Sequence, residues 1–183
     1  SHPNNLKDFY RTGTTTNHYV AIDSKYEKGS YRLSIGNMNA QSIIPGVDLK
    51  RRNVGSKLSF RPNHKLKIMA SLNYINTLSE NRPSGGYGSE NINYSLVAWG
   101  PRSLNTRALK NYWQPGLEDV QQYSFNYTFF DNPYFILHEN RNSFDRHRLF
   151  GNISAQYFFT NRLSLLIRTG LDYSAEKRQF VRA

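Results

Sequence analysis

The feature that most constrains this chain is a hydrophobic period of two between Arg146 and Tyr173, with a short break near Asn161 and exceptions at Phe150, Phe158 and Leu166. Alternation sustained in this way is typical of a β-strand and not of a helix, whose period is 3.6. Two such segments joined by a short polar turn predict a β-hairpin. Each strand is about twice the usual five or six residues and matches the roughly 9–11 residues that a tilted strand needs to cross a bilayer. The apolar series are Leu149, Gly151, Ile153, Ala155, Tyr157 and Phe159, and Leu163, Leu165, Ile167, Thr169 and Leu171.

The same alternation appears in four earlier segments, residues 17–24, 30–38, 52–61 and 65–78. Short turns are expected at residues 25–29, at 62–64 and near 161, and longer connections at 39–48 and 79–145. Short and long connections therefore alternate, as they do in an up-and-down meander whose two rims face different compartments. The predicted fold class is all-β: an antiparallel up-and-down meander that forms part of a transmembrane β-barrel with long extracellular loops. Residues 1–183 are predicted to be a single segment of such a barrel.

The region from Ser79 to Asp145 is long and irregular, and a loop of this length in a compact protein is usually functional. Within it the pattern predicts short helices over residues 90–99 and near 109–113. Residues 120–130 alternate weakly and are predicted to be either a strand extension or a β-segment within the loop. Residues 131–134 are predicted to be a turn. The polar residues 175–183 are predicted to begin another loop.

The charge is strongly basic, at +11, but the basic residues are scattered and form no tail. No helix-turn-helix, zinc-finger or RNP pattern is present, so no nucleic-acid partner is expected. We expect the cations to face the pore and the rims, some of them meeting lipid phosphates. The absence of cysteine excludes disulfides and thiolate metal sites. No P-loop, nucleophile elbow or HExxH helix is found, so neither enzymatic activity nor a cofactor or metal is predicted.

Aromatic residues make up 14% of the chain and are mostly Tyr and Phe. Membrane barrels use such residues as girdles at the two lipid–water interfaces. The residues that lie near predicted strand ends, and that we interpret as girdle, are Tyr31, Phe60, Tyr74, Tyr157, Phe159 and Tyr173.

The long irregular region is the predicted ligand-binding region, because flat aromatic faces stack on sugar rings and arginine binds carboxylates in a bidentate manner. Either a glycan or a peptide would suit this chemistry. Alternatively, the same aromatic residues pack the loop on itself or contact a partner protein. The candidate substrate-binding residues are Arg82, Tyr87, Tyr94, Trp99, Arg102, Tyr112 and Trp113.

A series of short motifs along the chain resembles the SusC/RagA class of TonB-dependent outer-membrane receptors. Each motif alone is weak, but their order and spacing match the early barrel region of that class over nearly the whole chain. The motifs are Phe9-Tyr10-Arg11-Thr12-Gly13, Tyr31-Arg32-Leu33-Ser34-Ile35-Gly36, Ile43-Ile44-Pro45-Gly46, Arg52-Asn53-Val54, Asn132-Pro133-Tyr134, Arg148-Leu149-Phe150-Gly151-Asn152 and Arg168-Thr169-Gly170-Leu171-Asp172.

The resemblance implies a bacterial outer-membrane location and TonB-driven import of a bulky nutrient, either a glycan or an oligopeptide. It also implies a SusD-like surface lipoprotein as partner, contact with outer-membrane lipid, and an interaction with TonB through a region outside this segment. About six strands are too few to close a barrel, since the smallest have about eight. We therefore expect further strands to lie outside residues 1–183, and the resemblance implies a plug domain that also lies outside them.

The alternative is a soluble basic β-sheet protein, either a carbohydrate-binding module or an adhesin. The two hypotheses differ in what the apolar side of the strands meets. Lipid contact favours the barrel, whereas a second sheet of the same chain packed on that side favours a sandwich.

Overall fold

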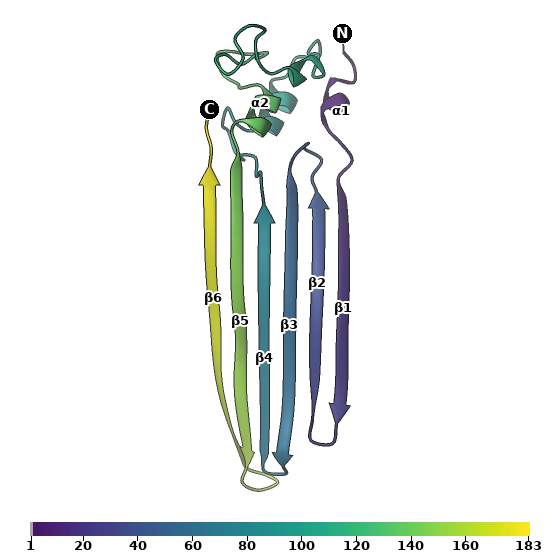
Figure 1. Ribbon diagram of the computed structural model, residues 1–183, viewed down its shortest axis with the longest axis vertical. Coiled ribbons are helices and arrows are strands. Elements are labelled where there is room, and N and C mark those ends of the chain that lie inside the picture. The colour runs from purple at the N-terminus through teal and green to yellow at the C-terminus, as the bar shows by residue number, and fades with distance from the viewer. Residues whose placement is uncertain (1) are drawn as a thin grey trace.

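The computed structural model describes residues 2–183 and contains a six-stranded antiparallel sheet in which each strand pairs with its neighbour in the sequence (Figure 1). This order confirms the predicted up-and-down meander. The strands are β1 (Thr14–Tyr26), β2 (Gly29–Gln41), β3 (Asp48–Asn63), β4 (Leu66–Ser79), β5 (Asn142–Phe158) and β6 (Ser164–Phe180).

The connections divide between the two edges of the sheet. The turns after β1, β3 and β5 are short and lie at the lower edge in Figure 1. The connection after β2 and the long segment between β4 and β5 lie at the upper edge, together with both ends of the chain. The predicted alternation of short and long connections is therefore correct. One rim of the sheet carries only short turns, and the other carries the long connections.

Five of the strands are longer than the hydrophobic pattern predicts, whereas β4 has its predicted length. β6 continues to Phe180, so the prediction that a loop begins at residue 175 is wrong. The upper part of β6 is polar, and it is held by backbone pairing with β5 and by Glu176, which lies between Arg146 and Arg178. Polar residues on both faces leave no hydrophobic period to detect, although the backbone ladder continues through them.

The register places the apolar series of all six strands on one face of the sheet. One row across the sheet is Val20, Ile35, Val54, Tyr74, Leu149 and Tyr173. The next row is Ile22, Leu33, Ser56, Leu72, Gly151 and Leu171. We call the face from the Val20 row down to Leu66, Tyr157 and Leu165 the apolar belt. Its side chains are exposed: Val20 by 67%, Ile35 by 62% and Ile167 by 65%. Within residues 2–183 the belt has no second sheet packed on it, contrary to what a sandwich requires.

The buried core lies beyond the upper edge of the sheet and not on either face. It is formed by the segments 2–13, 42–47 and 80–141, which together we call the cap. The cap contains α1 (Asn5–Phe9), η1 (Tyr94–Ala98), η2 (Ala108–Lys110) and α2 (Pro133–His138). Its buried cluster consists of Phe9, Ile44, Ile92, Leu96, Leu109, Tyr134, Ile136 and Leu137.

The local predictions for the cap are only partly right. The helix predicted over 90–99 is the shorter η1, and the one near 109–113 is the single turn η2. The β-segment predicted over 120–130 is wrong, because only two isolated bridges form there, Trp113–Gln122 and Asn126–Phe130. The turn predicted at 131–134 is the start of α2, with Pro133 in its first turn. Among residues 2–183, no helix has the length and hydropathy needed to cross a membrane.

Asn132 joins the separate segments of the cap. Its side chain is fully buried, and its amide nitrogen donates to the carbonyl oxygens of Leu109, at 3.0 Å, and Tyr123, at 2.6 Å. Its side-chain oxygen accepts from the Tyr134 backbone N–H at 2.8 Å and so caps α2. One side chain therefore satisfies three backbone groups from three parts of an irregular segment, where no ladder of regular structure is available.

We expect Asn132→Ala to destabilise the cap by about 2–4 kcal/mol, because it removes an N-cap and leaves the buried Leu109 carbonyl and the part-buried Tyr123 carbonyl without this donor. The measurement is hydrogen exchange of segment 80–141 in the full-length protein. The exposed Asn111→Ala is the matched control and should leave exchange unchanged. Equal exchange in the two variants would show that Asn132 does not hold the cap together.

Candidate functional site

The cap contains an open group of aromatic side chains that includes three of the predicted ligand-binding residues. The ring centroids of Tyr87 and Tyr94 are 5.3 Å apart, and those of Tyr94 and Trp99 are 6.3 Å apart. Phe130 lies beneath them, 5.9 Å from Tyr94 and 6.0 Å from Trp99. Tyr87 is 92% exposed and Trp99 is 56% exposed. We call these four residues the open aromatic group, and its rings can accept a flat or apolar ligand surface.

Tyr112 and Trp113 belong to a second, more enclosed group. Tyr112 lies 5.4 Å from the His138 ring in a stacked arrangement, and Trp113 lies 5.3 Å from Phe135. The Tyr112 hydroxyl donates to Glu139 Oε1 at 2.8 Å. These contacts hold the segment after η2 against α2, so the two residues pack the cap on itself, which is the alternative noted from the sequence.

The two predicted arginines lie apart from each other. Arg82 is placed over the ring of Phe144, 5.9 Å from its centroid, and lines a hollow of about 400 Å³ between the cap and the sheet with Ala40 and Leu49. Arg102 is exposed, and its carbonyl oxygen accepts from the His2 backbone N–H at 3.3 Å. Within residues 2–183, no hydrogen bond or ion pair joins either arginine side chain to the aromatic groups.

Sequence reasoning missed Phe130 and a set of exposed apolar side chains on the cap. Phe130 supports the open aromatic group, but it lies in the segment that we predicted as a strand. The high density of aromatic residues in segment 123–130 is a sequence signal for an aromatic cluster, but their spacing also resembles the alternation of a β-strand. The exposed set is Val97, Val120, Tyr127 and Phe129, with exposures from 58% to 77%.

The face of the sheet opposite the apolar belt, which we call the polar face, carries many cations. Some are paired: Arg32 lies 2.8 Å from Asp23, and Arg148 binds both carboxylate oxygens of Asp172. The carboxylates on this face are Asp23, Asp172 and Glu176. The cations are more numerous: Lys25, Arg32, Arg51, Lys57, Lys67, Arg146, Arg148, Arg168 and Arg178.

Two hollows of about 590 and 530 Å³ lie along the polar face, and Arg32 and Lys57 line both. Two glycines leave room for amide side chains there. A Cβ on Gly36 would lie 2.3 Å from Asn53 Oδ1, and a Cβ on Gly55 would lie 3.0 Å from Asn73 Oδ1. The face therefore presents guanidinium, ammonium and amide donors, which bind carboxylates, phosphates and carbonyl groups. No group of three potential metal ligands is present within residues 2–183.

Three tyrosines of the cap are in surroundings that favour the neutral phenol. Burial raises the pKa of Tyr10 and of Tyr134, and Asp8 adds to the effect at Tyr134. Burial also raises the pKa of Tyr112, with a further contribution from its hydrogen bond to Glu139. Ionisation of these phenols is therefore opposed by the folded cap.

Comparison with known proteins gives a likeness at the level of the fold. No family model matches the sequence, and no curated protein matches it. Among solved structures, one described as the RagAB peptide transporter is similar, with a TM-score of 0.67 and 20% sequence identity. The match covers 94% of this chain and 19% of that chain, so this chain spans about a fifth of its length. At this identity the comparison establishes a shared fold.

We expect the cap to loosen in alkali before the sheet does. A raised folded-state pKa gives stability that is present below the ordinary tyrosine value of 10.0 and is lost as the pH rises through the folded-state value. The measurement is limited proteolysis of segment 80–141 across this range. Tyr112→Phe should shift loosening to higher pH, whereas Tyr87→Phe, at an exposed ring, serves as control. Identical pH profiles for Tyr112→Phe and the parent protein would contradict the explanation.

Proposed function

We propose that this chain forms part of the wall and outer loops of a TonB-dependent transporter that imports a bulky nutrient across a bacterial outer membrane. The observation that carries the proposal is the apolar belt, an exposed apolar surface extending across a meander of long strands. An aqueous protein rarely leaves so large an apolar surface open, whereas lipid covers such a surface without further protein.

The dimensions and borders of the belt support contact with lipid. From Leu165 to Tyr173 on β6 the belt is about 27 Å long at roughly 3.4 Å per residue, close to the height of the apolar band of outer-membrane barrels. Tyr74 and Tyr173 lie along its upper edge. The aromatics along its lower edge are Tyr26, Phe60, Tyr157 and Phe159. This is the arrangement of two aromatic girdles.

In this proposal the polar face lines the interior of the barrel and the cap lies outside the cell. The strands β1 and β6 each have one unpaired edge in the sheet. Unpaired backbone groups are very unfavourable in hydrocarbon, so both edges pair with further strands of the same barrel. Energy input comes from TonB, which contacts a region outside this segment.

The cargo is an oligopeptide or a glycan, and the shared fold with a peptide transporter favours the peptide. The open aromatic group forms the outer contact, and the donors of the polar face suit peptide carbonyl and carboxylate groups. A SusD-like surface lipoprotein covers the cap, where Val97, Tyr127 and Phe129 are exposed. A soluble binding module would instead need to cover the apolar belt, for which the described residues supply no second layer.

If the belt contacts lipid, cysteines placed at two neighbouring residues of β2 should differ in their exposure to lipid and to water. In the full-length protein, with any other cysteine replaced, Ile35→Cys should be protected from a water-soluble thiol reagent, and a label there should be quenched by brominated lipid. Ser34→Cys, on the polar face, should show neither lipid quenching nor the same protection from water. Aqueous labelling of Ile35→Cys without lipid quenching would refute the membrane wall.

Removing rings of the open aromatic group is predicted to weaken ligand binding. We expect Tyr87→Ala with Trp99→Ala to weaken binding about tenfold, because two stacking faces are lost. The measurement is calorimetric titration of the full-length protein with a casein peptide digest and, separately, with malto-oligosaccharides. Tyr127→Ala, also exposed on the cap, is the control. Unchanged binding of both ligands, or equal loss in the control, would exclude this group as the contact site.

A further inference from the structure

The face of the sheet that carries the apolar belt, which we call the outward face, becomes polar and cationic above the belt. The row immediately above Val20 and Val54 contains His18, Asn37, Arg52, Asn76 and His147. The next row contains Asn39, Lys50 and Lys177, with Asp145 between the two lysines. Cations and amides thus lie on the same face as the belt, at the end that bears the cap.

Two cations on β3 form an exposed pair in this region. Arg52 and Lys50 are both exposed and are two residues apart, so both project from the outward face. In register beside them on β2 lie the amides of Asn37 and Asn39. Within residues 2–183, Arg52 has no carboxylate partner.

The nearby carboxylates are engaged elsewhere or hold the cations weakly. Asp48 accepts from Arg11 at 2.7 Å. Asp145 accepts from Asn76 at 2.6 Å and lies 3.3 Å from His147. Glu80 approaches Lys50 only to 3.7 Å, with both side chains exposed, and such a pair contributes little. An incoming anion therefore meets donors at Arg52 and Lys50 that are open to it.

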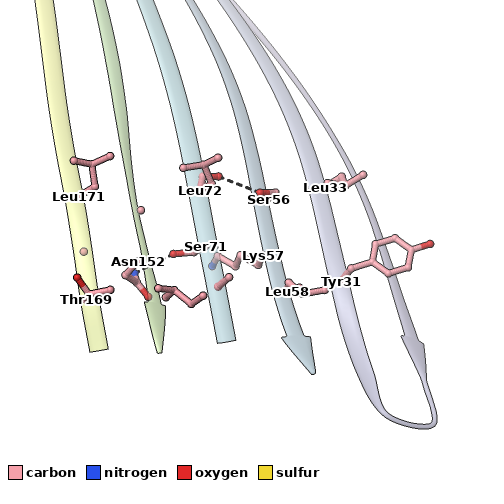
Figure 2. A pocket seen from close by; sticks show the side chains of 14 residues that line it. Tyr31, Leu33, Ser56, Lys57, Leu58, Ser71, Leu72, Asn152, Thr169 and Leu171 are labelled. Atoms are coloured by element: carbon pink, nitrogen blue, oxygen red, sulfur yellow. Dashed lines mark hydrogen bonds between the residues drawn. The ribbon is translucent and has the colours of Figure 1, made fainter. Parts of the chain in front are cut away.

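A shallow apolar hollow lies below this pair on the same face. It has a volume of about 530 Å³, and small residues on neighbouring strands form its floor: Ser56, Ala70 and Gly151. Figure 2 shows Leu33, Leu72 and Leu171 along one side of it and Tyr31 and Leu58 along the other. A Cβ on Gly151 would lie 2.2 Å from the Ser71 carbonyl oxygen, so this strand position excludes a larger side chain.

We infer that the outward face carries a site for a lipid with a phosphate-bearing headgroup, with the phosphate on Arg52 and Lys50 and an acyl chain in the hollow. The inference rests on the proposed membrane location. Ser56 is four residues below Arg52 on β3, a separation of about 13 Å. An acyl chain that extends downward from a phosphate on Arg52 would therefore enter the hollow. Two cations above and an apolar hollow below, on one face of the sheet, fit a single amphipathic lipid.

The test uses the full-length protein in nanodiscs of phosphatidylcholine that contain phosphatidic acid or, in a parallel set, phosphate-free diacylglycerol. Retained lipid is measured by native mass spectrometry. The variant Lys50→Gln with Arg52→Gln should retain less phosphatidic acid, with about a fivefold loss for each cation removed. Arg51→Gln is the matched control, because its side chain projects from the polar face. It should retain as much as the parent.

A second variant tests the hollow independently of charge. Ala70→Leu fills the floor without altering any cation, and should reduce retention of both lipids while Lys50→Gln with Arg52→Gln affects only phosphatidic acid. Free inorganic phosphate should not displace the lipid, since it lacks the chain. Retention that is unchanged in the double variant, or reduced equally by Arg51→Gln, would overturn the site. A protein that fails to enter nanodiscs at all would instead contradict the membrane location.

Discussion

The structure depends on one constraint, the register of an antiparallel ladder across six strands, which shifts between Phe60 and Asn63 at the end of β3. Side chains of a strand alternate between faces, so a slip of one residue between any two strands would transfer the whole apolar series of one of them to the opposite face. In this sheet Val20, Val54 and Tyr173 share a row although they are far apart in the sequence. The clean separation of an apolar belt from a cationic face follows from that register, and the proposed membrane wall and lipid site both depend on it.

The polar backbone groups of the cap are satisfied in a different way from those of the sheet. Its backbone lacks a regular ladder, so its polar groups are satisfied one at a time, by Asn132 above all and by pairs such as Thr106 to the Asn5 carbonyl oxygen at 2.6 Å. Its hydrophobic cluster joins α1, the loop at Ile44 and α2. Residues that are distant in sequence therefore hold the cap together, and the cap presents the open aromatic group with Tyr87 and Trp99 exposed.

The hydrophobic period was sufficient to predict the six strands, their order and the faces of their side chains, because each strand is apolar on one side. It failed where that contrast is absent. The upper part of β6 is polar on both faces, and its pairing with β5 and the ion pairs of Glu176 could not be read locally. Tyr112 and Trp113 were grouped with Tyr87 and Trp99 by residue type. Only tertiary packing against His138 and Phe135 separates the two pairs.

The strands continue well above the apolar belt before they reach the cap. From Val54 to Asp48, β3 rises by about 20 Å, and this part of the sheet carries amides, hydroxyls and cations. If the belt occupies the hydrocarbon, this polar part of the strands holds the aromatic surface of the cap about 20 Å above the acyl chains. A protein bound over the cap would then contact it without touching the bilayer.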